Sequence, residues 1–267
     1  MAVLQGVTEL FPISSLGHAV IAPALLGWKN IDENAPGFLP FLAVMHLGTA
    51  IALLGYFWKD WFRFALSLIW FRAPSAAADR RLFWRVVVAT IPAVVIGFLF
   101  EMTLRHGFGA PKMAAAFLMV NGVLLFASER FRRGAPGRLA TLSWLDALVI
   151  GLLQTLALIP GLSRSGATMA GGYMRGLDHE DAARFSFLTA TPIIFGAVVL
   201  EAPKLLRDHQ SFGPLSLLAG LIAGVTALVS LWALMRWFKI QEVRGFTPFA
   251  IYCVIAGAAA LIALSMV

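Results

Sequence analysis

LQTLALIPGLSRSG, residues 153–166, is an apolar stretch interrupted by a proline, by glycines and by hydroxyl-bearing residues. A similar interruption lies near the start of the chain, where residues 4–17 have the sequence LQGVTELFPISSLG. The two stretches can be aligned with a single gap, so that Leu4-Gln5 corresponds to Leu153-Gln154 and Pro12 corresponds to Pro160. Interrupted apolar segments at corresponding places in two halves of a membrane protein indicate discontinuous helices around a shared binding site.

The composition indicates that most of the chain lies in a membrane. Of its 267 residues, 60% are hydrophobic and only 13% are charged, and the mean hydropathy is +0.82. A chain of this size cannot bury so much apolar surface in one water-soluble core. The composition therefore excludes a soluble enzyme and a disordered protein. It also excludes a disulfide scaffold, since Cys253 is the only cysteine.

Six apolar runs are long enough to cross a bilayer, which takes about 20 residues of helix. We place these spans at 40–58, 83–103, 113–129, 185–202, 215–235 and 248–266. The interrupted segments, 3–27 and 144–170, are expected to be re-entrant hairpins of two half-helices each. Because three spans separate the hairpins, they enter from opposite faces. The sequence thus predicts an all-α polytopic membrane protein, one domain over 1–267, with inverted repeat halves of about 1–130 and 141–267.

The basic residues predict the orientation of these spans. Segments rich in Lys and Arg alternate along the chain with segments poor in them. The rich segments are 59–85, 130–143, 171–184 and 236–247, and the poor ones are 28–39, 104–112 and 203–214. The positive-inside rule places the rich segments, as loops, in the cytoplasm and both termini outside. The formal charge of +7 is therefore assigned to loops that face anionic lipids, not to nucleic-acid binding.

Arg164 is the one basic residue left inside an apolar segment. A charge at membrane depth is costly and normally faces a polar cavity. The planar guanidinium, placed between Ser163 and Ser165, supplies donors that suit phosphate oxygens. A half-helix that starts after a break also exposes unpaired N–H groups, which favour an anion. An ion pair between Arg164 and Glu9 is the structural alternative. The hydroxyls could likewise act only as N-caps, as Ser14, Ser15, Ser163 and Thr168 are all suited to do.

The first interrupted segment carries three further candidate residues. Gln5 and Glu9 are spaced i, i+4, so they share one helix face just before the break. Glu9 is a candidate ligand for Mg²⁺ or Ca²⁺, with Gln5 adding a carbonyl and phosphate oxygens and water completing the shell. His18 follows Ser15 by three residues, so their side chains are expected to meet. A histidine beside a serine can deprotonate it, or a water, and then protonate a leaving group.

Two other motifs are assigned to structure. Asp146 follows Ser143 by three residues at the start of a half-helix, which is the spacing of a capping box. Gly220-x-x-x-Gly224 is a weak signal for helix packing or a tight turn.

Two motifs resemble a known family. QGVTELFPISSLGH, residues 5–18, resembles the first signature of the bacterial undecaprenyl-diphosphate phosphatase family of the bacitracin-resistance type. PGLSRSGAT, residues 160–168, resembles its second signature. The resemblance implies a cation-dependent hydrolysis of undecaprenyl diphosphate to the monophosphate and inorganic phosphate, in the bacterial inner membrane. This reaction recycles the lipid carrier for peptidoglycan and other envelope polymers. The first half-helix is shorter than its counterpart, so the natural start is expected upstream of Met1.

The resemblance also implies roles for individual residues. Glu9 with Gln5 resembles the acidic motif for metal and substrate, and His18 resembles the acid/base. Our own hypothesis for the mechanism is that Ser15, activated by His18, or a water in that place attacks the terminal phosphorus, with Ser14 as the rival serine. The phosphate clamp and other substrate contacts are expected around the second break, at Gln154, Gly161, Ser163, Arg164, Ser165, Gly166 and Thr168.

A transporter is the alternative class, because inverted repeats with broken helices are usual for alternating access. Such a protein would flip a polyprenyl phosphate or carry a small anion. The combination of Glu, His, Ser and Arg favours hydrolysis, since anion transport alone needs no acidic residue beside the site. The prenyl tail is expected between apolar spans, open sideways to membrane lipids. The face to which the site opens, and whether the protein is a homodimer, are left open.

Overall fold

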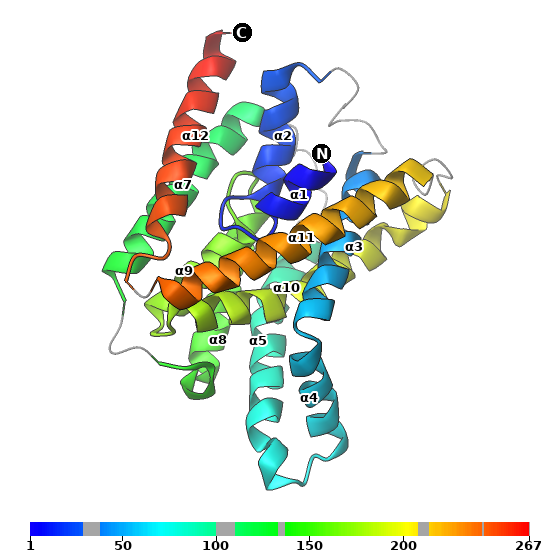
Figure 1. The fold of residues 1–267 in the computed structure, drawn as a ribbon, viewed down its shortest axis with the longest axis vertical. Coiled ribbons are helices and arrows are strands. Elements are labelled where there is room, and N and C mark those ends of the chain that lie inside the picture. Colours follow the sequence, from blue (N-terminus) through cyan, green and yellow to red (C-terminus); the bar gives the residue numbers. More distant parts are fainter. Residues whose placement is uncertain (29–37, 100–109, 133–136, 208–213, 242, 267) are drawn as a thin grey trace.

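The computed structural model describes residues 1–28, 38–99, 110–132, 137–207, 214–241 and 243–266. These residues are almost entirely helical (Figure 1). The α-helices are α1 (Ala2–Thr8), α2 (Ser15–Leu26), α3 (Phe38–Tyr56), α4 (Trp58–Ile69), α5 (Ala77–Leu99), α7 (Pro111–Arg130), α8 (Trp144–Gln154), α9 (Arg164–Met174), α10 (His179–Arg207), α11 (Pro214–Ile240) and α12 (Thr247–Met266). The described residues also form short 3₁₀ helices, which are η1 (Pro74–Ala76), η2 (Leu139–Thr141) and η3 (Thr155–Leu158). The expected loops 28–39 and 104–112 lie largely outside the described residues. Residues 208–213 of the expected loop 203–214 also lie outside them, but its first residues, up to Arg207, continue the helix α10, so the loop begins later than predicted.

Within the described ranges, five helices are long and apolar enough to cross a membrane. They are η1 with α5, then α7, the part of α10 up to Leu200, α11 and α12. A sixth candidate is α3 together with α4, which are bent by 72° with respect to each other. The all-helical membrane fold is thus confirmed, with five to six candidate spans.

The segment 59–85 differs from its prediction. We expected a cytoplasmic loop, whereas most of this segment is helical, in α4 and the first turns of α5. The helix α4 packs on α5 and buries Phe64 and Ser67. Its other side exposes Phe62 and Ile69. Charged and apolar residues alternate here with helical periodicity, so the segment forms an amphipathic helix in spite of its basic residues.

Both interrupted segments are broken helix pairs, as their prolines predicted. The first break, residues 9–14, separates α1 from α2, and the second break, residues 159–163, separates η3 from α9. A serine begins the helix after each break. Ser14 Oγ accepts from the backbone N–H of Gly17 at 3.2 Å. Ser163 Oγ accepts from the N–H of Gly166 at 3.0 Å. The N-capping role that these hydroxyls suggested is confirmed for both serines.

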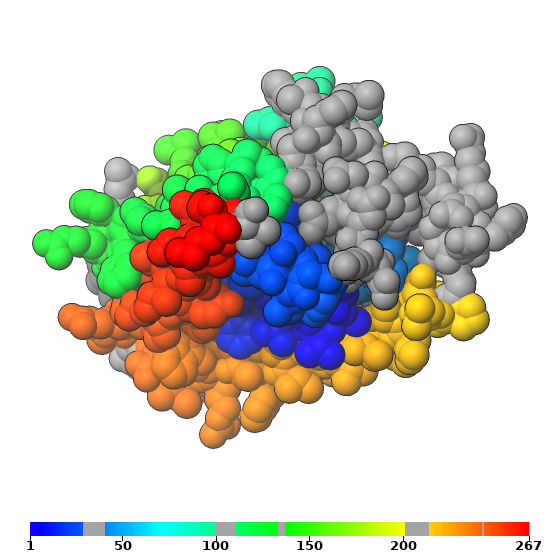
Figure 2. Space-filling view, turned by 90° about the horizontal axis from the view of Figure 1, so that it is seen from above, coloured from blue at the N-terminus to red at the C-terminus, as the bar shows by residue number. Residues whose placement is uncertain are grey.

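Helices from the N-terminal part of the chain pack against helices from the C-terminal part. The helix α1 contacts α11, α3 contacts α10 and α11, α5 contacts α8 and α10, and α7 contacts α9 and α12. The C-terminal end of α12 and the turn between α4 and α5 lie at opposite ends of the molecule (Figure 1). Seen from above, α2 lies beside α12 and α7, and α1 lies between α2 and α11 (Figure 2).

The contact between α3 and α11 depends on glycine. A Cβ at Gly48 would lie 1.9 Å from the carbonyl oxygen of Gly220, and one at Gly224 would lie 2.9 Å from that of Gly48. The two backbones therefore touch, and no side chain fits between them. This close approach confirms the packing role expected for Gly220-x-x-x-Gly224.

The distribution of side chains is that of a protein solvated by lipid. Large apolar side chains such as Val123, Val225 and Ile255 are exposed on the outer faces of the helices. Small and polar side chains are enclosed between the helices, and Asn121 and Ser186 are fully buried. Polar groups in a bilayer must be satisfied within the protein, so their place is inside the bundle.

Candidate active site

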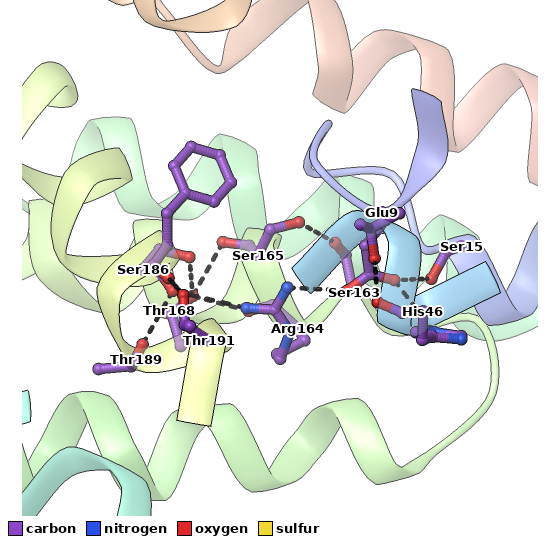
Figure 3. A network of polar contacts seen from close by, with 12 residues as sticks. Glu9, Ser15, His46, Ser163, Arg164, Ser165, Thr168, Ser186, Thr189 and Thr191 are labelled. Atoms are coloured by element: carbon purple, nitrogen blue, oxygen red, sulfur yellow. Dashed lines mark hydrogen bonds and ion pairs between the residues drawn. The ribbon is translucent and has the colours of Figure 1, made fainter. Parts of the chain in front are cut away.

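An ion pair between Glu9 and Arg164 joins the two broken helix pairs (Figure 3). Arg164 Nη2 donates to Glu9 Oε1 at 2.9 Å. Glu9 comes directly after α1, and Arg164 is the first residue of α9. The side chain of Arg164 is 13% exposed and that of Glu9 6%. The ion pair considered as an alternative from the sequence is therefore present.

The ion pair forms part of the wall of a cavity of about 630 Å³. The polar lining residues are Glu9, Ser14, Ser15, His46, Gln154, Ser163, Arg164 and Ser165. The other lining residues are apolar and come mainly from α3, η3, α5 and α10. A largely apolar cavity with a few convergent polar groups is the usual form of a small-molecule site. Arg164 thus faces a ligand-sized space, as a charge at membrane depth was expected to do.

The Glu9 carboxylate is contacted by side chains from four elements. Its Oε1 accepts the bond from Arg164 of α9. Its Oε2 accepts from Gln5 Nε2 of α1 at 3.2 Å and from Ser15 Oγ of α2 at 2.6 Å. The Nε2 atom of His46, on α3, lies 3.3 Å from the same oxygen. The contact with Gln5 is the one that the i, i+4 spacing predicted.

The two candidate nucleophiles have different surroundings. Ser15 Oγ donates to the Glu9 carboxylate, an arrangement in which a base adjoins the hydroxyl. Ser14 Oγ donates instead to the carbonyl of Leu162 at 3.3 Å while it caps α2. Ser14 also has a φ of 71°, which a residue with a side chain adopts only at some cost. The geometry favours Ser15 as the reacting hydroxyl and gives Ser14 a structural role.

His18 does not contact Ser15. Its Nδ1 lies 2.7 Å from the carbonyl oxygen of Ser14, and its Nε2 lies 2.8 Å from the hydroxyl of Tyr252 on α12. The ring also stacks on the Tyr252 ring, with the centroids 5.8 Å apart. The expected contact between His18 and Ser15 is therefore wrong, because the ring turns toward α12 and binds the carbonyl one turn back. An acid/base role for His18 rests on the resemblance alone.

His46 contributes an imidazole to the cavity wall and was not among the site residues predicted from the sequence. Its Nδ1 lies 2.8 Å from the carbonyl oxygen of Leu42, which orients the ring, and its Nε2 faces Glu9. His46 lies outside both signatures, within the run 40–58 that we predicted as a span. An ionisable residue inside an apolar span is itself a sign of a functional position, and that sign could have identified it.

Buried hydroxyls lie on the other side of Arg164 (Figure 3). Arg164 Nη1 lies 3.5 Å from the carbonyl oxygen of Ser186. Thr168 Oγ1 donates to the carbonyl oxygen of Arg164 at 2.8 Å and bonds to the hydroxyl of Ser186. Thr168 is only 1% exposed and is not among the lining residues of the cavity. The expectation that Thr168 contacts substrate is therefore not supported, and its hydroxyl instead supports the first turn of α9.

The glycines and serines in the second break and in the first turn of α9 hold the backbone close to neighbouring elements. Gly161 has a φ of 99°, and a Cβ there would lie 2.2 Å from the carbonyl oxygen of Ala114. Ser165 Oγ donates to the carbonyl of Phe11 in the first break at 3.1 Å and lies 3.0 Å from Ser163 Oγ. A Cβ at Gly166 would lie 3.3 Å from the carbonyl oxygen of Pro12. Both glycines are thus required for close packing between the breaks and their surroundings.

Gln154 and Asp146 complete the expected residues. Gln154 Nε2 donates to the carbonyl of Ala89 at 3.3 Å. Its buried Oε1 has no hydrogen-bond partner among the residues that the structure describes, and the residue lines the cavity. This acceptor is available to a donor on a ligand. Asp146 forms the predicted capping box with Ser143 and an ion pair with Arg175, which confirms its assignment to structure.

The chemical types of the groups at Glu9 are compatible with binding of a hard divalent cation. Mg²⁺ and Ca²⁺ prefer oxygen ligands. Glu9 supplies a carboxylate and Ser15 a hydroxyl, whereas the Gln5 amide faces Glu9 with its nitrogen, so its oxygen could join them only if the amide turned. In the part of the chain that the structure describes, no group of three or more His, Cys, Asp or Glu side chains could hold a metal. A cation at Glu9 would therefore need further oxygens from a ligand and from water.

The fold and the site together define a multi-pass membrane protein whose cavity can hold an anionic headgroup beside an apolar tail. The family model described as bacitracin resistance protein BacA matches residues 1–259, and the chain belongs to this family. It is 51% identical to an undecaprenyl-diphosphatase of Acidiphilium cryptum over 269 residues, which are 98% of this chain and 95% of the relative. It is 50% identical over 279 residues to one of Granulibacter bethesdensis, covering 98% and 94% of the two chains. It is 43% identical over 299 residues to one of Mycobacterium avium, again covering 98% and 94%.

Proposed function

We propose that this protein hydrolyses undecaprenyl diphosphate to undecaprenyl monophosphate and inorganic phosphate, and so returns the lipid carrier to envelope polymer synthesis. The relatives named undecaprenyl-diphosphatase align with 98% of the chain. The observation that carries the proposal is that Arg164, Glu9 and Ser15 meet at one wall of a cavity that is otherwise mostly apolar. Such a cavity suits a molecule with a charged head and a hydrocarbon tail.

We infer that the fold is an inverted repeat in which α1–α2 and α8–α9 are re-entrant hairpins. The packing of the helices supports this inference. In this repeat, α1, α3, α5 and α7 of the first half correspond to α8, α10, α11 and α12 of the second. Each contact between helices should then have an equivalent between the corresponding helices. The equivalent of the α1–α11 contact is α8–α5, and the equivalent of the α3–α11 contact is α10–α5. The contacts α3–α10 and α7–α12 map onto themselves. All of these contacts are present.

The substrate enters from the outer leaflet in this proposal. The cavity is lined by residues 93–98 in the second half of α5, residues 193–200 of α10, and residues 42–46 in the first half of α3. If the basic segments before α5 and α10 lie in the cytoplasm, with both termini outside the inner membrane, these three stretches all belong to the outer half of the bilayer. The prenyl tail lies between α5 and α10, where membrane lipids border it.

Arg164 binds the terminal phosphate. Its guanidinium is held between the Glu9 carboxylate and the carbonyl of Ser186, which fixes its direction before substrate arrives. A guanidinium can bind two phosphate oxygens at once. The N-termini of α2 and α9 begin beside the same cavity wall and add their partial positive charges. Donors fixed in this way stabilise the charge that the transferred phosphoryl group develops in the transition state.

Ser15 attacks the terminal phosphorus. Glu9 Oε2 accepts the proton of the Ser15 hydroxyl, and Ser15 Oγ bonds to the terminal phosphorus. The bond from that phosphorus to the bridging oxygen breaks and releases undecaprenyl monophosphate. Water then cleaves the phosphoserine and releases inorganic phosphate. A water molecule in the place of the Ser15 hydroxyl is the alternative attacking group. The observation that favours the serine is its 2.6 Å hydrogen bond to Glu9.

Mg²⁺ or Ca²⁺ is part of this proposal, with Glu9 and Gln5 as the residues that would hold it. When bound, the cation would withdraw negative charge from the phosphate oxygens. Glu9 would then be shared between the cation and Arg164. Gln5, which donates to Glu9, would orient the carboxylate in either case.

Phosphate release by the purified protein tests the function. We expect release from undecaprenyl diphosphate that a chelator abolishes and added Mg²⁺ or Ca²⁺ restores. Transport of the lipid or of an anion without phosphate release would assign the protein to the transporter class. Full activity in the presence of chelator would remove the cation from the proposal and leave the hydrolysis in place.

A further inference from the structure

Asn121 of α7 connects the two breaks. Its Nδ2 donates to the carbonyl of Pro12 in the first break at 2.8 Å. Its Oδ1 accepts from the backbone N–H of Ser163 in the second break at 3.1 Å. The side chain is fully buried, and Cys253 Sγ, at 3.4 Å from Nδ2, also contacts it. A single amide thus binds one backbone group of each break.

The two backbone groups require such a partner. The carbonyl of Pro12 and the N–H of Ser163 lie where the helices are interrupted, so no regular helical hydrogen bond satisfies them. A buried backbone group without a partner is costly. An amide side chain carries a donor and an acceptor in a fixed relation, so it satisfies both groups and also sets the distance between them.

The contacts of Asn121 lie next to the reacting groups. Ser163 directly precedes Arg164, and Pro12 lies between Glu9 and Ser15 in the chain. The other links use side chains of the broken segments themselves: the rotatable hydroxyl of Ser165 bonds to the carbonyl of Phe11, and the side chain of Arg164 bonds to that of Glu9. Asn121 differs because it is anchored on α7, which packs against both α2 and α9. Asn121 therefore fixes the positions of both breaks relative to α7.

We propose that Asn121 is a positioning residue for the hydrolysis, which holds Ser15 and Glu9 at the correct distance from Arg164. Asn121 is not among the lining residues of the cavity, so it acts through the two breaks and not by touching substrate. The proposal deepens the proposed function and rests on it. A misplacement of about 1 Å between reacting groups can reduce a rate about 100-fold.

Two substitutions test the proposal against a matched control. Asn121→Leu removes both hydrogen bonds and keeps the branching of the side chain, although its two methyl groups make it larger. Asn121→Asp keeps the size and an acceptor for Ser163 but, when ionised, has no donor for Pro12. The control is Ser128→Ala, since Ser128 is equally buried on α7 and bonds only to the carbonyl of Leu125 among the described residues. We expect kcat on undecaprenyl diphosphate to fall about 100-fold for Asn121→Leu. KM should stay within about threefold, because α3, α5 and α10 still bind the tail.

A second readout does not depend on activity. Phenylglyoxal modifies accessible arginines, and mass spectrometry of the peptide that contains Arg164 measures its rate of modification. Arg164 is held by Glu9, so its modification should be slow in the wild type and in Ser128→Ala. It should be several-fold faster in Asn121→Leu. If the wild type released no phosphate, the proposed function would fail while this measurement still tested the positioning.

The outcomes separate positioning from a general structural role. Folded Asn121 variants with a kcat within about twofold of the control, or with unchanged modification of Arg164, would overturn the proposal. A rise in KM that accounts for the whole loss of kcat/KM would also overturn it. Failure of both variants to fold, while Ser128→Ala folds, would assign Asn121 to stability alone and equally overturn it.

Discussion

The hydroxyl of Ser15 donates a 2.6 Å hydrogen bond to Oε2 of Glu9. The other oxygen of the same carboxylate binds Arg164, a residue from the opposite half of the chain. One acidic side chain therefore links the group that would attack the phosphorus to the group that would bind the phosphate. This coupling explains why a carboxylate lies beside an anion site, and four predictions about the site follow from it and from its neighbours.

Replacement of Ser15 by alanine should reduce phosphate release at least about 1000-fold, because it removes the nucleophile while the phosphate-binding groups remain. Ser14→Ala is the matched comparison. It removes a helix cap and should lower stability by about 1 kcal/mol, with a much smaller effect on kcat. The measurement is the rate of phosphate release by each variant. Trapping of a phosphorylated Ser15 in the wild type is a second, direct test. Comparable activity of Ser15→Ala and Ser14→Ala would exclude the serine mechanism in favour of water.

Arg164→Lys should reduce kcat about 100-fold or more, since lysine keeps the charge but not the planar pair of donors that a phosphate group requires. The control is Arg63→Lys on the exposed side of α4, which should leave the kinetics unchanged. Steady-state phosphate release decides the comparison. Near-wild-type turnover in Arg164→Lys would refute the phosphate clamp.

His46→Phe should lower kcat about tenfold, because Oε2 of Glu9 loses a neighbour that restrains the carboxylate. His46→Gln retains a side-chain donor and should recover much of that loss. The pair is informative because a phenylalanine and a glutamine both remove the imidazole, so recovery by glutamine alone identifies the hydrogen bond as the important feature. Equal activity of the two variants would contradict this role for His46.

Gly196→Leu should weaken binding of a long-chain substrate. Gly196 lines the apolar part of the cavity, and nothing lies within 4 Å of the Cβ position, so the added side chain occupies space that the tail would use. We expect KM for undecaprenyl diphosphate to rise about tenfold, which corresponds to about 1.4 kcal/mol, and KM for a C15 prenyl diphosphate to change less. Gly55→Leu is the control, because Gly55 has equal space around it and does not line the cavity. If KM rose equally for undecaprenyl diphosphate and for the C15 prenyl diphosphate, the long tail would not lie beside Gly196.

The sequence by itself determined the class of protein and the location of the site within the chain. Hydropathy identifies a membrane protein because spans must be apolar over their whole length. Proline and glycine identify the two breaks because their effects on the backbone are local. The contact of Gln5 with Glu9 follows from helix geometry alone. The isolated charge of Arg164 indicated a cavity, and the structure has one.

Only the tertiary structure decided which groups complete the site. Nothing local to His18 distinguishes a ring directed at Ser15 from one directed at Tyr252, since the choice depends on where α12 packs. His46 and Asn121 lie far along the chain from the signatures and reach the breaks only because α3 and α7 pack beside them. Helix periodicity fixes contacts within about one turn. Contacts between helices depend on how every pair of faces fits together, and that information is spread over the whole chain.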